Sequence, residues 1–350
     1  MEQSGPRMQY VDALRGVSIL LVVLHHVFGK MGPVMALPSA LALRETFASF
    51  RMPLFFFLSG YFAYRAADRW TAGKLRDVFS KKVCAQIIGT AVFATIFCLW
   101  FDIDIPAFFS NIGDGEYWFT VVLFQMFVLY ILLMLLTRGL RRGDRIFTAL
   151  TIVLATVMYA VNICLTVSHN CIQLCNFTDA CGWGKLTFFF PYFAIGLLAR
   201  GSGTRLFRLM TRRFFSFVNV AVFLLCLIFI SDIDYTSKGK LLHLACGVSG
   251  VLTLFMLFYG SRRYFDSGRA LPRVMSFVGR RTLDIYFIHY LFLPDLAFIP
   301  IEVYGTNPAL PLLVIGLGVS AAVTAAALAV SRVIRVSPTL SLLLFGSRQQ

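Results

Sequence analysis

Ten apolar stretches constrain this chain more than any other feature, because each is close to the roughly 20 residues that a helix needs to cross a bilayer. Of the residues, 58% are apolar and only 14% are charged, against about 45–50% and about 25% in soluble domains. The sequence therefore predicts an all-α, polytopic membrane protein, and it excludes a disordered chain, a coiled coil and a small disulfide scaffold. The ten predicted helices cover residues 10–29, 46–66, 79–101, 117–137, 146–167, 184–200, 214–231, 241–260, 281–300 and 310–334.

The basic residues divide the connections between these helices into two classes. Of the 32 Lys and Arg residues, 26 lie at the two ends of the chain or in the even-numbered connections. Short loops rich in Lys and Arg stay in the cytoplasm, so we expect both termini to be cytoplasmic. The net charge of +15 therefore indicates how the chain is oriented in the membrane rather than nucleic-acid binding. Binding of anionic cytosolic ligands or anionic lipids to the basic cytoplasmic face is the second interpretation. We expect residues 1–350 to form one integral domain without a separate soluble domain.

The start of the chain also permits a different interpretation. Arg7 and Arg15, followed by the apolar run 17–28, are compatible with a secretory signal peptide. The adjacent His25 and His26 would be unusual in such a leader, so a retained first helix is favoured.

Three cysteines share the connection after the fifth predicted helix, which the charge pattern places outside the cell. They are Cys171, Cys175 and Cys181, and Cys164 lies near the outer end of the preceding helix. Disulfides persist in that compartment, and four cysteines allow three connectivities, so the pairing stays open. A zinc site with His169 is the rival interpretation; a disulfide is favoured and no metal is predicted.

The first predicted helix carries polar side chains that are costly inside a membrane and are therefore functional candidates. Arg15 and His26 are eleven residues apart, which places them on one helix face about 16.5 Å apart along the axis. A histidine exchanges protons near neutral pH, as a general base acting on a hydroxyl must. A histidine that hydrogen-bonds a neighbouring helix fits the pattern equally well.

Other polar residues lie in the second, fourth and ninth predicted helices. Arg51 is placed near the outer end of the second helix, where it can snorkel to the interface or face a polar cavity. Gln125 lies in the fourth helix, and Tyr286 and His289 share a face of the ninth. The chain has no Gly-rich phosphate loop, Gly-x-Ser-x-Gly elbow or His-Glu-x-x-His motif.

Five separated segments, taken in order, resemble the integral-membrane acyltransferase 3 family and in particular its sugar O-acetylase branch. Each segment alone is weak evidence for the family, whereas the five in this order are a specific match that spans most of the chain. The segments are VDALRGVSILLVVLHHVF, RMPLFFFLSGYF, YWFTVVLFQ, FFFPYFAIGLLARG and GRRTLDIYFIHYLFL.

This resemblance implies transfer of an acyl group, commonly acetyl, from cytosolic acyl-CoA to a hydroxyl of a carbohydrate or related cell-envelope acceptor. It implies functional roles for Arg15 and His26. After the second helix many members carry two Arg three residues apart and then a Pro, where this chain has SKKVCAQIIGT. Lys81 and Lys82 can replace the first of these two arginines, and no second Arg follows.

These features combine into one hypothesis for the reaction. The CoA phosphates would bind near Arg15, Lys81 and Lys82, and His26 would act as general base on the acceptor hydroxyl. Arg51, Gln125, Tyr286 and His289 are the candidate oxyanion or acceptor contacts, and an acyl-histidine route stays open.

The expected partners are acyl-CoA as co-substrate, a carbohydrate or glycolipid acceptor and membrane lipids. No permanently bound cofactor is expected, and the bacterial inner membrane is the expected location. A multi-pass transporter or exporter of a polar or lipid-linked solute is the alternative function.

Overall fold

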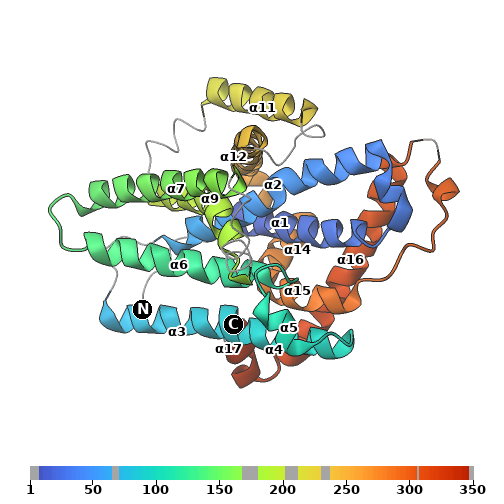
Figure 1. Cartoon of the computed structure of the whole chain (residues 1–350), viewed down its shortest axis with the longest axis horizontal. Helices are drawn as coiled ribbons and strands as arrows, with labels where there is room; N and C mark the ends of the chain where they lie inside the picture. Colours follow the sequence, from blue (N-terminus) through green and yellow to red (C-terminus); the bar gives the residue numbers. More distant parts are fainter. Residues whose placement is uncertain are drawn as a thin grey trace. The chain divides into compact units, whose positions relative to one another are not determined.

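The computed structural model describes residues 8–64, 71–167, 180–201, 212–229, 237–305 and 307–346. Every regular element in these ranges is a helix (Figure 1). Six of the helices are long and apolar enough to cross a bilayer, which agrees with a polytopic membrane protein. They cover Gln9–Phe28, Ala72–Trp100, Trp118–Thr137, Gly143–Leu165, Gly239–Gly260 and Ala309–Ile334.

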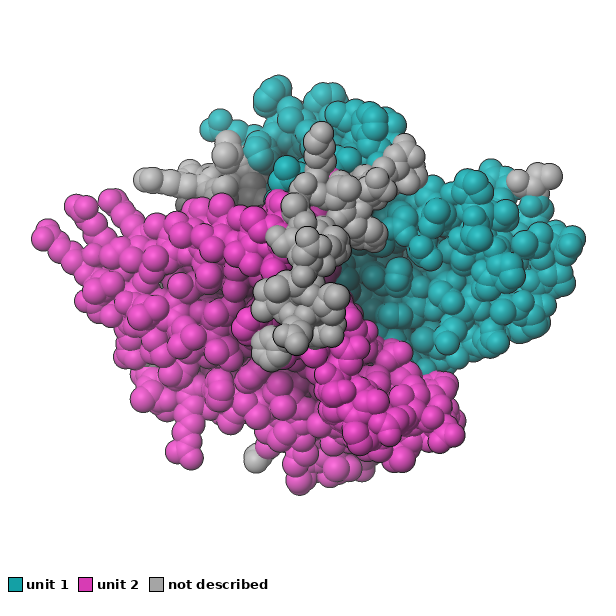
Figure 2. Space-filling view, in the orientation of Figure 1, with its two compact units in different colours: residues 1–55, 207–233, 241–329 teal, residues 56–206, 234–240, 330–350 magenta. Residues whose placement is uncertain are grey.

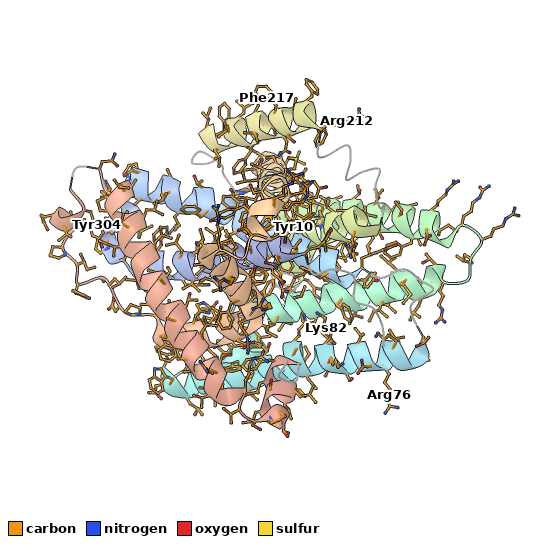
Figure 3. All side chains as sticks on the ribbon, turned by 180° about the vertical axis from the view of Figure 1, so that it is seen from behind. Tyr10, Arg76, Lys82, Arg212, Phe217 and Tyr304 are labelled. Carbon is orange, nitrogen blue, oxygen red and sulfur yellow. The ribbon has the colours of Figure 1, made fainter. Side chains whose placement is uncertain are left out.

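The other four predicted spans correspond to shorter, more polar or broken helices. Residues 46–63 of the predicted span 46–66 fall in α2 (Pro38–Ala63), which contains Arg51 and Pro53. Residues 184–200 fall in α9 (Trp183–Gly201), and residues 214–228 of the predicted span 214–231 fall in α11 (Arg213–Ile228). Apolar side chains of α11 are nevertheless exposed, as Phe217 is at 72% (Figure 3), so this helix also presents a surface suited to lipid.

The described chain forms two compact units, which Figure 2 colours separately. Unit 1 comprises residues 1–55, 207–233 and 241–329, and unit 2 comprises residues 56–206, 234–240 and 330–350. The prediction of one integral domain stays a prediction.

Unit 1 is built around α1, which packs mainly against α14 and also contacts α13 and α15. Besides α11 and parts of α2, α12 (Ser237–Gly260) and α16, it contains α1 (Gln9–Phe28), η1 (Gly32–Ala36), α13 (Arg262–Phe265), α14 (Ala270–Arg280), α15 (Thr282–Ile288), η5 (His289–Phe292) and η6 (Ile301–Tyr304).

In unit 2, α6, α7 and α9 pack on one another, and α17 packs on the π-helical segment η3. Its elements are the end of α2, α3 (Ala72–Lys82), η3 (Val83–Ile88), α4 (Gly89–Trp100), α5 (Ile105–Ser110), α6 (Trp118–Thr137), α7 (Gly143–Val167), α9, the start of α12, the end of α16 (Ala309–Ile334) and α17 (Pro338–Phe345).

The predicted helix over residues 281–300 is wrong in its length and continuity. The chain instead forms α15, tightens into the 3₁₀ turn η5, and leaves helical structure after Phe292. Pro294 follows two residues later, and a proline disfavours continuation of a helix because it lacks the N–H and its ring clashes with the preceding turn. The backbone of Leu296 then donates to the carbonyl of Lys30 at 2.9 Å, which fixes this segment beside the end of α1.

Two glycines allow α1 and α14 to approach closely. A Cβ atom on Gly279 would lie 1.7 Å from the carbonyl oxygen of Asp12, and one on Gly16 would lie 2.3 Å from that of Met275. Both clashes would be with backbone, which cannot rotate away. Small residues at such crossings let helix backbones pack directly on each other in membrane proteins.

We expect Gly279→Ala to destabilise the protein by about 1–3 kcal/mol, the usual cost of overpacking. The thermal unfolding midpoint in detergent measures this. Gly318→Ala in α16 is the control, because nothing lies within 4 Å of its added Cβ. Equal midpoints for the two variants would contradict the close crossing of α1 and α14.

Candidate functional site

Arg15 lies in the first half of α1 and contacts the start of α15. The Arg15 Nη2 nitrogen donates to Thr282 Oγ1 at 3.1 Å, and its Nη1 nitrogen lies 4.0 Å from Asp12 Oδ1. The Arg15 side chain stays 33% exposed, whereas that of Asp12 is 8% exposed. Arg15 therefore contacts the buried carboxylate of Asp12 and the first residue of α15, while part of its side chain stays exposed to solvent.

His26 lies eleven residues further along α1 and contacts the far end of the same segment. Its Nε2 is 3.1 Å from the hydroxyl oxygen of Tyr290 in η5, and the ring centroids are 4.8 Å apart. Tyr290 is buried and His26 is half-buried. Arg15 and His26 thus both face residues 282–290, as their spacing predicts.

His289 supplies a second imidazole beside His26, with the ring centroids 5.3 Å apart. Its Nδ1 lies 3.0 Å from the carbonyl oxygen of Ile285 and 2.8 Å from that of Tyr286. Carbonyl oxygens only accept hydrogen bonds, so Nδ1 carries the hydrogen. In the neutral ring Nε2 then presents a lone pair, and this atom is buried without a hydrogen-bond partner among the described residues.

Arg51 lies inside α2 rather than near its end, since the helix begins at Pro38. Its Nε and NH1 atoms are buried and have no hydrogen-bond partner within the described ranges. The two predicted alternatives for Arg51, snorkelling to the interface and facing a polar cavity, both stay predictions. The guanidinium is close enough to His25, His26 and Tyr290 to act on them electrostatically.

Several buried polar atoms without a hydrogen-bond partner lie around His26. Ten buried side-chain nitrogen or oxygen atoms lack a partner in the described part of the chain, and four of them are His25 Nδ1, Arg51 Nε and NH1, and His289 Nε2. Buried polar groups are normally satisfied, and those that are not call for a specific explanation. The Arg51 donors and the bare acceptor of His289 lie beside the His26 imidazole and provide groups that can bind a polar reactant.

Tyr286 is buried in α15, with its ring centroid 6.2 Å from those of both His289 and Tyr290. It accepts a hydrogen bond from His289 through its backbone, so it belongs to this cluster, as its predicted face implies. Sequence reasoning missed Tyr290. Its spacing of four residues from Tyr286 was the available signal, because residues four apart share a helix face.

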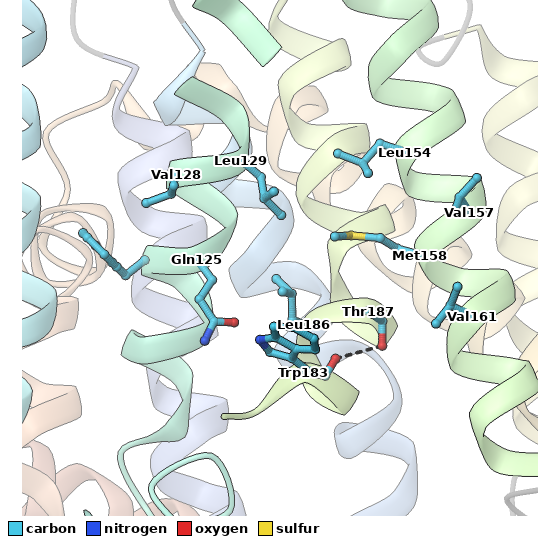
Figure 4. Close-up of a pocket in the computed structure, with 11 residues that line it drawn as sticks. Gln125, Val128, Leu129, Leu154, Val157, Met158, Val161, Trp183, Leu186 and Thr187 are labelled. Carbon is cyan, nitrogen blue, oxygen red and sulfur yellow. Dashed lines mark hydrogen bonds between the residues drawn. The ribbon is translucent and has the colours of Figure 1, made fainter. Parts of the chain in front are cut away.

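Gln125 lies in unit 2, where its Nε2 donates to the carbonyl of Cys181 at 2.9 Å. The amide lines a cavity between α6, α7 and α9 (Figure 4). Its predicted contact with the reacting groups stays a prediction.

Lys81 and Lys82 also lie in unit 2, at the end of α3. Lys81 Nζ pairs with Asp77 at 3.1 Å, and Lys82 Nζ lies 5.2 Å from the centre of the Phe127 ring. Figure 3 labels Lys82 and Arg76, of which Arg76 extends away from the α3 ribbon. Both lysines remain predicted donor contacts.

The described residues do not test the predicted disulfide. Cys164 and Cys181 carry free thiols, and Cys171 and Cys175 lie outside the described residues, so the bond stays a prediction. Within the described ranges no group of three or more His, Cys, Asp or Glu side chains is arranged to hold a metal ion.

Comparison with known proteins gives one match. A family model described as an acyltransferase domain, that of the acyltransferase 3 family, matches residues 8–332. No curated protein and no solved structure matches the chain. The matched range includes Arg15, His26 and the segment 282–290, and it favours an enzyme over the alternative of a transporter.

Proposed function

The chain belongs to the acyltransferase 3 family and is a membrane acyltransferase, and on that premise we propose that it carries an acetyl group from cytosolic acetyl-CoA to a hydroxyl. The acceptor is a cell-envelope carbohydrate or a lipid-linked sugar, and the bacterial inner membrane is the location. The observation that carries this proposal is the hydroxyl of Tyr290 at 3.1 Å from His26 Nε2. An acceptor hydroxyl needs this separation for general-base catalysis.

In this mechanism the acceptor hydroxyl replaces the Tyr290 hydroxyl at His26 Nε2. This nitrogen takes the acceptor proton while the acceptor oxygen attacks the thioester carbonyl carbon. A new C–O bond forms and the C–S bond breaks. The proton passes from the imidazolium to the departing CoA thiolate, which leaves as the free thiol. Atoms and charge balance in one step, with no acyl-enzyme intermediate.

Arg51 is the group that we assign to the oxyanion. Its unpartnered Nε and NH1 hydrogens are fixed donors beside His26, and preorganised donors of this kind stabilise the negative charge that develops on a thioester oxygen. His289 Nε2 is an acceptor and cannot serve an oxyanion. It is suited to a second hydroxyl or N–H of the bound reactants.

Arg15 would contribute at the cytoplasmic end of the same helix face. Its partly exposed guanidinium is suited to the phosphates of CoA, because arginine forms charge-assisted, paired hydrogen bonds with phosphate. Lys81 and Lys82 are proposed as further phosphate contacts, and the disulfide among the outer cysteines remains part of the proposal.

The test uses purified protein in lipid nanodiscs with radiolabelled acetyl-CoA and an envelope glycan extract. We expect release of CoA thiol and a labelled, alkali-labile ester on the glycan fraction. A transporter would leave acetyl-CoA intact. Intact acetyl-CoA with folded protein, across extracts that contain both lipid-linked and soluble glycans, would contradict the proposal.

Replacing Tyr290 with Phe should lower the acetyl-transfer rate by roughly 2–10-fold, the equivalent of one hydrogen bond of about 0.5–1.5 kcal/mol. The Tyr290 hydroxyl orients the His26 ring before the acceptor binds and does not react, so the loss should be modest. Initial rates in nanodiscs measure it, with Tyr117→Phe in unit 2 as the control. A complete loss of activity would instead make the Tyr290 hydroxyl part of the chemistry.

A further inference from the structure

A cavity of about 580 Å³ lies within unit 2, between α6, α7 and α9 (Figure 4). This volume is in the range of small-molecule sites. Nine of its eleven lining side chains are apolar, and the other two are Gln125 and Thr187. Nothing in the mechanism proposed above uses it.

The two polar side chains of the wall are hydrogen-bonded in part. Gln125 Nε2 donates to the Cys181 carbonyl, and Gln125 Oε1 is buried without a hydrogen-bond partner among the described residues. The hydroxyl of Thr187 donates to the carbonyl of Trp183 at 2.9 Å and accepts from Asn162. A ligand inside the cavity would therefore meet carbon over nearly all of the wall, which favours a hydrocarbon chain over a polar molecule.

The cavity opens outward from helices that are apolar enough to span a bilayer. Val157, Val161 and Trp183 on its rim are 51%, 43% and 48% exposed, and α6 and α7 contain two of the six candidate spans. Where these helices cross a membrane, the open side faces lipid chains.

The two ends of this helix group differ in polarity. Trp183 is the first residue of α9, and Trp118 is the first residue of α6. The centre of the Trp118 ring lies 5.0 Å from Lys185 Nζ, which forms an ion pair with Asp114. Tryptophan with charged neighbours is typical of a membrane interface. The opposite end carries the arginines of the α6–α7 connection, namely Arg138, Arg141, Arg142 and Arg145, which the positive-inside rule assigns to the cytoplasm.

We propose that this cavity binds the hydrocarbon chain of a bilayer lipid, with the headgroup at the Trp183 end and hence in the outer leaflet. A partner helix fits less well, because a helix 10–12 Å across would fill the volume with about one turn. A flexible chain can follow the groove between α6 and α7.

The experiment uses the full-length protein in nanodiscs that contain a phospholipid with a photoreactive diazirine in one acyl chain. After irradiation, peptide mass spectrometry should locate the label on α6, α7 and α9 around the cavity. Val161→Trp, which places an indole in the mouth, should lose this labelling. Leu132→Trp should keep it, because Leu132 is 51% exposed on α6 and is not part of the cavity wall.

Val157→Phe is the second variant if Val161→Trp does not fold, as judged by its thermal midpoint. Equal labelling of the cavity peptides in the cavity and control variants would overturn the proposal. So would labelling spread evenly over all exposed helices, or crosslinks between two copies of the chain through α6 and α7. None of these readouts depends on acetyl transfer, so they are separate from the test of the proposed function.

Discussion

Replacing His26 with alanine is expected to lower the acetyl-transfer rate by about 10²–10⁴-fold, the usual contribution of a general base. The variant removes the only atom that the mechanism assigns to the proton of the acceptor hydroxyl. His26 is half-buried and its ring contacts Tyr290 and His289, so the variant should still fold. Initial rates with labelled acetyl-CoA measure the effect, and the thermal midpoint reports folding.

His25→Ala is the matched control for this prediction. The two histidines are adjacent, with ring centroids 5.6 Å apart, and they differ in that Tyr290 contacts His26. His25→Ala should retain most of the rate. A variant without His26 that acetylates at a near-normal rate, or a His25 variant that loses as much as the His26 variant, would contradict the assignment of the base.

Arg51→Met should separate activity from stability. Loss of one preorganised oxyanion donor costs about 10²–10³-fold in rate. The same change removes buried guanidinium nitrogens that have no partner in the described residues, and replacing a buried charge by a well-packed apolar side chain is often neutral or stabilising. We expect the transfer rate to fall while the thermal midpoint is unchanged or higher.

Arg44→Met provides the comparison for Arg51 on the same helix. The Arg44 guanidinium pairs with Glu45 at 3.0 Å, and its side chain is 36% exposed, so its loss should change the rate little. If Arg51→Met unfolds the protein, or if it leaves the rate unchanged, Arg51 has a structural role and the oxyanion donor lies elsewhere.

Local periodicity predicted the part of the site that depends on one helix. The eleven-residue spacing placed Arg15 and His26 on one face of α1, and both contact residues 282–290. The resemblance to the acyltransferase 3 family, read from ordered motifs, is confirmed by the match over residues 8–332.

What the sequence did not reveal depends on tertiary structure. A hydropathy window treats 281–300 as one apolar run, whereas the chain leaves helical structure before Pro294, and this break sets the positions of His289 and Tyr290 relative to His26. The burial of Arg51 follows from the start of α2 at Pro38 and from packing around it. Neither is encoded in the periodicity of a single segment.

The location of the acyl group in a complex with a non-hydrolysable acetyl-CoA analogue tests the central claim most directly. A solved structure of that complex should show the carbonyl carbon beside His26, with its oxygen about 2.7–3.1 Å from a nitrogen of Arg51, the distance expected of an oxyanion donor. An acyl group bound against α6, α7 and α9 with no contact to His26 would contradict the claim.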